Sequence, residues 1–187
     1  ELDALDYDSH DAFLDSPPDL PDIAVCAVGY MGEQSENEAD MEAARLVMRS
    51  NFEGPANLLS LLANRFEARG SGTLIGISSV AGDRGRATNY VYGSAKAGFT
   101  AFLSGLRNRL AKRGVHVMTV KPGFVATKMT EGMDLPDKLT ADPDKLARAV
   151  LHAAKMRRNI IYVKPVWWLV MLIIRNIPEA IFKKLSI

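Results

Sequence analysis

Three short segments of the chain are apolar at nearly every position, and they span residues 22–29, 72–78 and 115–120. An apolar run without alternation is typical of a strand that is buried on both faces, as in a parallel sheet covered by helices. Residues 160–163, Ile-Ile-Tyr-Val, predict a further strand. The chain therefore contains at least the strands of a small buried sheet.

Longer segments between these runs have the spacing of amphipathic helices. One runs from about residue 37 to 69 and another from about 89 to 113, and Gly70 and Gly114 follow them as stop signals. The pair Asp142-Pro143 predicts a helix start, because aspartate caps well and proline suits the first helical position. Strands thus alternate with helices, which predicts an open α/β sheet with right-handed crossovers.

The length of the chain suits one core. It has 187 residues, of which 48% are hydrophobic and 24% charged, and it contains no internal repeat or low-complexity linker. We expect a single domain over residues 1–187. The polar segment 128–142, which contains Pro136, is the one long connection, and connections of this length often form lids over a site.

Charge excludes some partners. The formal net charge is +1, so no overall field attracts nucleic acid, and we expect no nucleic-acid partner. Charge is nevertheless uneven, since no Lys or Arg precedes Arg45 and only Glu179 is acidic after Lys155. The two ends of the chain are therefore expected to face different surroundings.

The cysteine and histidine residues predict neither disulfides nor a metal site. Cys26 is the single cysteine, which excludes an internal disulfide and fits a reducing, cytoplasmic location. His10, His116 and His152 have no metal-ligand spacing, so no metal is expected.

The most apolar run lies near the C-terminus, from Val166 to Ile174, between Lys164 and Arg175. It is too short to cross a bilayer, which takes about 20 apolar residues. A buried helix and an interfacial helix at a membrane both remain open, and Trp167 and Trp168 are accordingly either core anchors or interface residues.

A serine, a tyrosine and a lysine form the candidate chemistry. Ser78 and Ser79 end a predicted strand, and Tyr92 and Lys96 lie four residues apart on the following helix, hence on one face. A nearby ammonium lowers the pKa of a phenol, which helps it to exchange a proton with an alcohol or carbonyl. Ligands of open α/β sheets gather at strand carboxyl ends, so the three side chains are expected to converge on one carbonyl oxygen.

These residues, in this order, resemble the classical short-chain dehydrogenase/reductase family. The segment Tyr92-Gly-Ser-Ala-Lys96 resembles its Tyr-x-x-x-Lys helix, Ser79 has the family's spacing from Tyr92, Asn51 resembles its helix asparagine, and residues 122–127 resemble the segment around the nicotinamide. The resemblance implies a Rossmann-like doubly wound parallel sheet. It also implies an NAD(P)-dependent oxidoreductase that moves a hydride between the nicotinamide and a carbonyl or secondary alcohol.

The resemblance assigns the catalytic roles. Tyr92 would be the general acid, Lys96 would lower the pKa of Tyr92 and bind the nicotinamide ribose, and Ser79 would donate a hydrogen bond to the substrate oxygen, with Ser78 as its rival. Asn51 would hold a water that links Lys96 to solvent; the alternative is a polar residue on a helix surface. A non-catalytic nucleotide sensor or a membrane-associated scaffold on the same fold is the competing interpretation, and the intact Ser, Tyr and Lys argue against it.

The resemblance also assigns cofactor contacts. Residues 2–6 resemble the end of the family's third strand, where an aspartate meets the adenine. Cys-Ala-Val-Gly at 26–29 stands where the family has Asn-Asn-Ala-Gly, which keeps the glycine and loses the amide side chains. The expected contacts to NAD(P)H are Asp3, Ala4, Cys26, Ala27, Gly29, Tyr92, Lys96, Pro122, Gly123, Val125 and Thr127.

The family's first strand, Gly-rich turn and first helix, which hold the pyrophosphate, have no counterpart in the sequence. We therefore expect that this Rossmann-like domain lacks its N-terminal βαβ part here, and that roughly fifty further residues precede Glu1. Without that strand, segment 22–28 would be an open sheet edge. The choice between NAD and NADP depends on residues after the second strand and stays open.

Both ends of the chain, residues 1–10 and 177–187, resemble the polyprenyl-phosphoryl 2-keto-pentofuranose reductases within this family. That implies a lipid-linked keto-sugar substrate and a peripheral contact with a membrane. We also expect a homodimer or homotetramer, because five apolar residues recur at helical spacing. Together they form more apolar surface than one helix face can bury against its own sheet. These residues are Phe99, Phe102, Leu103, Leu106 and Leu110.

Overall fold

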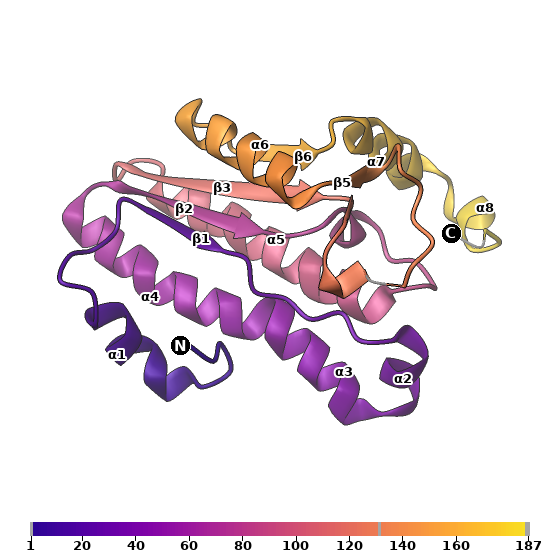
Figure 1. Ribbon diagram of the computed structural model, residues 1–187, viewed down its shortest axis with the longest axis horizontal. Coiled ribbons are helices and arrows are strands. Elements are labelled where there is room, and N and C mark those ends of the chain that lie inside the picture. The colour runs from indigo at the N-terminus through magenta and orange to yellow at the C-terminus, as the bar shows by residue number, and fades with distance from the viewer. Residues whose placement is uncertain (1, 131, 186–187) are drawn as a thin grey trace.

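The computed structural model describes residues 2–130 and 132–185. Its centre is a parallel sheet of four strands in the order β1-β2-β3-β6. These strands span β1 Ile23–Cys26, β2 Gly72–Ile77, β3 Val115–Pro122 and β6 Ile160–Val163. Helices α4 (Gly54–Arg69) and α5 (Tyr90–Leu110) cover one face, and α6 (Pro143–Lys155) covers the other (Figure 1). The predicted α/β fold with a parallel sheet is confirmed.

The other elements frame this sheet. The remaining α-helices are α1 His10–Asp15, α2 Gln34–Ala39, α3 Met41–Met48, α7 Val166–Asn176 and α8 Glu179–Phe182. Short 3-10 turns are η1 Tyr7–Ser9, η3 Val80–Asp83 and η4 Lys128–Thr130, and η2 Arg49–Glu53 is a π-helical turn. Two short strands, β4 Phe124–Val125 and β5 Thr140–Ala141, pair in parallel beyond the end of β3.

The local stop and start signals act as expected. Gly70 and Gly114 have positive φ angles of 77° and 75°, a backbone conformation that glycine adopts without strain. The carboxylate of Asp142 accepts a hydrogen bond of 2.8 Å from the backbone N–H of Asp144, at the start of α6. Helix and strand boundaries encoded by caps and glycines could therefore be predicted from the sequence.

The prediction of one long helix over residues 37–69 is wrong at its N-terminal end. Asp40 has an extended backbone, with φ −121° and ψ 115°, and separates α2 from the helical segment 41–69. Its carboxylate accepts a hydrogen bond from Glu42 N, because aspartate satisfies a free N–H better as a cap than inside a helix. Residues 41–69 then continue through α3, the π turn η2 and α4.

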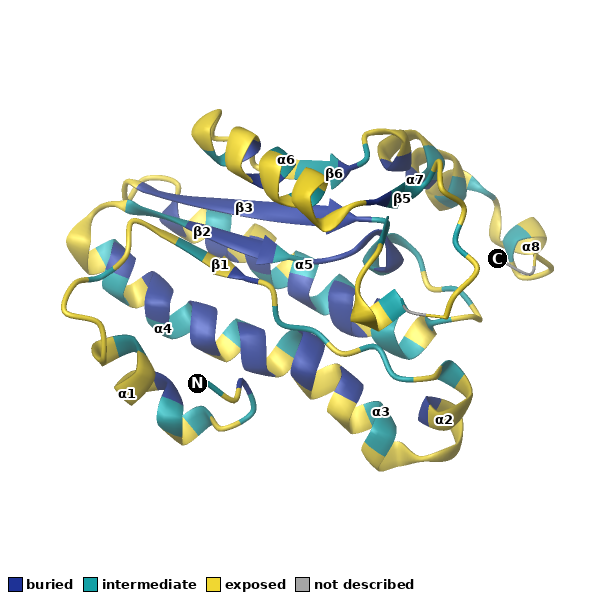
Figure 2. Ribbon diagram, viewed as in Figure 1, coloured by how far each residue is buried: buried dark blue, intermediate teal, exposed yellow. Residues whose placement is uncertain are grey.

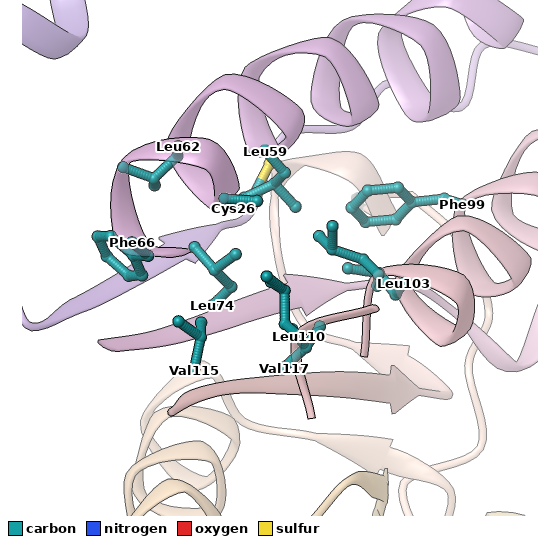
Figure 3. Packing of buried hydrophobic residues seen from close by; sticks show 12 residues of the cluster. Cys26, Leu59, Leu62, Phe66, Leu74, Phe99, Leu103, Leu110, Val115 and Val117 are labelled. Atoms are coloured by element: carbon teal, nitrogen blue, oxygen red, sulfur yellow. The ribbon is translucent and has the colours of Figure 1, made fainter. Parts of the chain in front are cut away.

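Two apolar clusters hold the layers together. The larger lies between the sheet and helices α4 and α5, and Figure 3 shows its central side chains. It includes Leu59 and Phe66 from α4, Leu74 from β2 and Leu103 from α5. The second cluster lies between the sheet and α6 and contains Met118 and Val150. These two clusters fix the positions of the strand ends at which the candidate site lies.

Strand β1 departs from the expectation that each strand is buried on both faces. Ala24 and Cys26 pack against the larger cluster, whereas Ile23 and Val25 point to the opposite face and are about half exposed (Figure 2). The reason is that β1 is an edge strand, and the apolar cluster under α6 draws its strand residues from β2, β3 and β6. Residues 22–28 thus contain the edge strand expected there.

The apolar stripe of α5 does not have the expected role in self-association. Phe99, Leu103, Leu106 and Leu110 are all buried in the chain's own larger cluster, and only Phe102 is half-buried. The interpretation that this stripe offers spare apolar surface is therefore wrong. The 21-residue helix α5 lies across the sheet, and its apolar stripe packs into the core of the same chain.

The C-terminal apolar run forms α7, which packs on η3 and the β4–β5 pair through Trp167 and Met171. Trp167 is buried, as a core anchor would be, while Trp168 is exposed, so a role of Trp168 at a membrane interface stays a prediction. The described helices are all too short or too polar to traverse a bilayer.

Candidate active site

Ser79 and Tyr92 meet at the carboxyl end of the sheet. Ser79 follows β2 and caps η3, where its Oγ accepts a hydrogen bond of 3.1 Å from Ala81 N. Tyr92 lies in the first turn of α5, where the Ser79 side chain is close enough to its phenol to lower its pKa. The structure thus joins the serine and the tyrosine that the sequence predicted to converge.

Ser78 points elsewhere. Its Oγ lies 3.1 Å from the backbone oxygen of Lys96 and 2.6 Å from Thr100 Oγ1, so its hydroxyl ties β2 to α5. Side chains on consecutive strand residues point to opposite faces, which is why only one of the two serines can reach the tyrosine. The geometry favours Ser79 over Ser78 for contact with a substrate.

Lys96 is a buried cation one helical turn after Tyr92. Its Nζ donates to the carbonyl oxygens of Ile77, at 3.2 Å, and Val28, at 3.4 Å, and lies 5.7 Å from the centre of the Tyr92 ring. Burial lowers the pKa of Lys96 from 10.5 to about 8. Within residues 2–130 and 132–185 no carboxylate forms an ion pair with it, so neutral backbone groups hold this charge.

The pKa of Tyr92 moves in the direction opposite to the one expected from Lys96. Burial raises the pKa of Tyr92, and the hydrogen bond with Ser79 lowers it by a smaller amount. The sequence argument considered only the neighbouring charge, whereas removing a phenolate from water is the larger effect here. At neutral pH Tyr92 therefore keeps its proton and is able to donate it.

Asn51 is fully buried in the π turn η2, so the alternative of a polar helix-surface residue is wrong. Its Nδ2 donates to the carbonyl oxygens of Val47, at 2.8 Å, and Tyr30, and its Oδ1 accepts from Tyr30 N at 3.3 Å. These bonds fix the loop after β1 against the helix. The water link from Asn51 to Lys96 stays a prediction.

Gly29 lies between Asn51 and Lys96. A Cβ added at this glycine would lie 2.9 Å from Asn51 Oδ1 and 3.3 Å from Lys96 Nζ, which is closer than side chains tolerate. A glycine here therefore leaves room for the amide and the ammonium to face the same space. The glycine retained in the Cys-Ala-Val-Gly segment thus has a steric reason.

The other residues expected at the cofactor lie at different distances from this centre. Cys26 is buried at the end of β1, where burial raises the pKa of its thiol, and Ala27 is exposed. Asp3 bonds within its own turn, through Oδ1 to Leu5 N at 2.8 Å, and the Ala4 carbonyl oxygen packs against Gly54. Ala4 therefore contacts the start of α4, and the carboxylate of Asp3 bonds inside the turn before it.

The Pro122-Gly123 segment continues β3 beyond the sheet. Gly123 N donates to Val163 O at 3.2 Å, and a Cβ at this position would collide with the Trp167 indole. Val125 pairs with Ala141, and Thr127 is exposed beyond it. The segment is thus held between β6 and α7 on the same strand-end side of the sheet as Ser79.

A buried ionic network that the sequence did not predict lies beside the site. Lys121 Nζ lies 2.5 Å from Asp83 Oδ1, and the Tyr162 hydroxyl donates to Asp83 Oδ2 at 2.7 Å. Burial and the Asp83 carboxylate together raise the pKa of Tyr162 to about 12. The network joins the turn after Ser79 to the strand before Pro122. The only local signal was that Asp83 and Lys121 flank two family motifs.

Comparison with known proteins shows which family the chain resembles. The family model for short chain dehydrogenases matches residues 21–137. An uncharacterized oxidoreductase of Mycobacterium tuberculosis is 35% identical over 162 residues, which are 87% of this chain and 65% of the relative. One of Streptomyces coelicolor is 34% identical over 189 residues, covering 100% of this chain and 74% of the relative. The chain thus spans about two thirds to three quarters of these relatives.

A solved structure agrees with the fold. The short chain dehydrogenase of Burkholderia cenocepacia J2315, crystallised in complex with NADP, superposes with a TM-score of 0.87 at 21% identity and covers 100% of this chain and 80% of that one. The family match includes the loop of Gly29, the turn of Ser79, the helix of Tyr92 and Lys96 and the Pro122-Gly123 segment. The chain therefore belongs to the short-chain dehydrogenase/reductase family.

Proposed function

We propose that this protein is an NAD(P)H-dependent oxidoreductase that reduces a carbonyl to a secondary alcohol. The observation that carries the proposal is the meeting of Ser79, Tyr92 and Lys96 at the carboxyl end of the sheet, with Tyr92 protonated and close to the Ser79 side chain. A non-catalytic nucleotide binder has no use for this combination.

The side chains divide the work of the reaction. Tyr92 donates its proton to the carbonyl oxygen as the carbonyl carbon accepts a hydride, and Ser79 donates a hydrogen bond to the same oxygen. The buried ammonium of Lys96, 5.7 Å from the ring centre, stabilises the phenolate that remains on Tyr92. Asn51 keeps the neighbouring loop in place through its three backbone hydrogen bonds.

The residues present fit the nicotinamide half of NAD(P)H, which supplies the hydride when bound. Lys96 is a buried cation that donates to two backbone carbonyls within the described residues, so its third N–H group suits a ribose hydroxyl. Gly29 leaves the adjoining space free of a side chain, and Gly123 follows β3 without one. The NADP bound by the Burkholderia cenocepacia protein is consistent with this proposal.

Replacement of Tyr92 by Phe tests the proposal. We expect Tyr92→Phe to lose at least about a hundredfold in kcat for NADPH or NADH oxidation with carbonyl substrates, because only the proton donor is removed. Cofactor affinity, measured by fluorescence titration, should stay within a few-fold. Tyr90→Phe is the matched control, since Tyr90 is an exposed tyrosine two residues earlier. Activity of Tyr92→Phe within a few-fold of wild type would refute the mechanism.

We further propose that the carbonyl belongs to a lipid-linked keto-sugar and that the enzyme works in the cytoplasm at the surface of a membrane. The resemblance of residues 1–10 and 177–187 to polyprenyl-phosphoryl keto-sugar reductases supports this proposal. A comparison of kcat/KM for a polyprenyl-phosphoryl 2-keto-pentose and for the free keto-sugar tests it. Equal values for the two substrates would contradict a lipid-linked substrate.

We also propose that the protein is a homodimer or homotetramer, as the family resemblance implies. The buried apolar stripe of α5 gives no support to this proposal. Sedimentation velocity at micromolar concentration distinguishes the oligomers from a monomer, and a monomer alone would refute the proposal.

A further inference from the structure

Helix α7 and the segment after it expose several large apolar side chains. A surface helix normally has one apolar face, turned to the core, and one polar face. The inner face of α7 is occupied, since Trp167 and Met171 are buried against η3 and the β4–β5 pair. Its outer face is apolar as well. We define the tail surface as the outward residues of α7 and of the segment around α8, which are each between 41% and 60% exposed: Trp168, Leu169, Leu172, Ile173, Ile181 and Leu185.

Exposed cations lie at the C-terminal end of the tail surface. Arg175 lies in the last turn of α7, and Lys183 and Lys184 follow α8, whereas the ammonium of Lys164, before α7, donates to the backbone oxygens of Asp137 and Lys138. The one acidic residue after Lys155 is Glu179, whose carboxylate pairs with Arg84 at 2.8 Å. The edge of the tail surface is therefore positively charged, and its complement is an anionic surface with an apolar interior.

The tail surface is held firmly against the body of the protein. Arg84 donates to the carbonyl oxygens of Ile174, at 2.6 Å, and Ile177, at 2.7 Å, and its guanidinium lies 3.5 Å from the centre of the Phe182 ring. Trp167 Nε1 donates to Leu139 O at 3.0 Å on the inner side. The apolar side chains are thus presented in a fixed arrangement, which lowers the ordering cost of binding.

We propose that the tail surface docks on a membrane that contains anionic lipids, with α7 lying in the plane of the headgroups. Exposed Trp and branched apolar side chains enter the boundary of the acyl region, while the lysine and arginine side chains reach the lipid phosphates. A protein partner of comparable affinity would need an apolar cleft ringed by acids. The mixture of a single exposed Trp, aliphatic side chains and peripheral lysines is the composition of an interfacial helix.

This orientation places the catalytic turn next to the membrane. Arg84, which holds the tail, follows Ser79 by five residues through η3. Helix α7 also packs on the β4–β5 pair, which continues from the Pro122-Gly123 segment. A carbonyl carried on a membrane lipid would therefore reach Ser79 and Tyr92 from the docked side. This last step rests on the proposed function, whereas the docking itself does not.

Vesicle flotation of the full chain tests the docking. The vesicles are phosphatidylcholine alone and phosphatidylcholine mixed with phosphatidylglycerol. The variants are Trp168→Ser/Ile173→Ser, which removes apolar contact, and Lys183→Gln/Lys184→Gln, which removes charge. Leu151→Ser/Met156→Ser is the matched control, because these two exposed apolar residues lie on and just after α6, outside the tail surface. Circular dichroism and thermal melting establish that each variant folds.

We expect wild type and the α6 control to float with the anionic vesicles, and each tail variant to bind at least about tenfold more weakly. Salt should weaken the binding of wild type. Absence of flotation of wild type, equal flotation of wild type and the tail variants, or equal binding to neutral and anionic vesicles would each overturn the proposal. Oxidation of NADPH with a soluble carbonyl and no vesicles is measured in parallel. Activity without flotation refutes the docking alone, and flotation without oxidation of NADPH by either the soluble carbonyl or the lipid-linked keto-sugar refutes the proposed reaction alone.

Discussion

Loss of the Asp83 carboxylate should destabilise the fold strongly. Asp83→Asn keeps the size of the side chain but leaves the ammonium of Lys121 without its counter-charge. The two side chains are 3% and 8% exposed, so water cannot replace the lost partner. Breaking a buried ion pair by removal of one member costs about 3–5 kcal/mol, compared with about 0–1 kcal/mol for an exposed pair.

That loss is large relative to the whole stability of a domain, which is about 5–15 kcal/mol. The assay is urea unfolding followed by tryptophan fluorescence and far-UV circular dichroism, with the free energy of unfolding obtained by linear extrapolation. Arg45→Ala is the control. Arg45 and its partner Glu42 are 67% and 75% exposed, and we expect a change below about 1 kcal/mol.

A double-mutant cycle separates the ion pair from other effects of the substitutions. In Asp83→Asn/Lys121→Met the buried charge is also removed, so the double variant should be more stable than the sum of the single losses predicts, by at least about 1 kcal/mol. Tyr162→Phe should cost about 1–2 kcal/mol, since it removes one hydrogen bond to the carboxylate. Additivity within about 0.5 kcal/mol, or a loss in Asp83→Asn no larger than in Arg45→Ala, would refute the buried network as a source of stability.

Three further predictions concern the core around the site. Gly123→Ala should lower the free energy of unfolding by about 1–3 kcal/mol, because the added Cβ collides with Trp167. In the control, Gly105→Ala, the Cβ meets open space inside a helix and should not destabilise the fold; equal effects of the two variants in urea titrations would contradict the prediction. Between pH 8 and 10.5 the folded chain has released the Lys96 proton and the unfolded chain still holds it, so the stability of wild type relative to Lys96→Met should rise with pH, by roughly 3 kcal/mol in total. A constant difference over that range would show that Lys96 is not desolvated. Burial raises the pKa of the Cys26 thiol, so iodoacetamide should modify Cys26 much more slowly in the folded chain than in urea, as followed by mass spectrometry; similar rates would refute its burial.

The structural features that could be predicted are those that depend on residues close together in the sequence. The strand at 160–163 was located residue for residue, and the stops at Gly70 and Gly114 were correct, because apolar runs and left-handed glycines are local signals. The buried network of Asp83, Lys121 and Tyr162 could not be predicted, since it joins a turn and two strands far apart in the chain. The direction of the Tyr92 pKa likewise depends on burial, which only the packed structure gives.

One part of the candidate site could likewise be predicted from the sequence, and another part could not. The spacing of Ser79, Tyr92 and Lys96 is a sequence property, and their meeting follows from a strand end facing the start of a helix. The choice between Ser78 and Ser79 needed the structure, because the two serines follow β2 directly one after the other, and the contacts of Ser78 with Lys96 O and Thr100 show that its hydroxyl points away from Tyr92.

The π turn η2 constrains the number of residues in the helical segment 41–69. An α-helix advances by about 100° per residue, so the additional residue accommodated in a π turn changes the phase between the helical faces before and after it. Val47, before the turn, and Leu59, after it, are both buried in this phase, and Asn51 lies between them. Deletion of a single residue from 49–53 would restore a regular helix and rotate one of these buried faces toward solvent. Relatives that share this site should therefore vary in residue type along 41–69 but not in the number of residues.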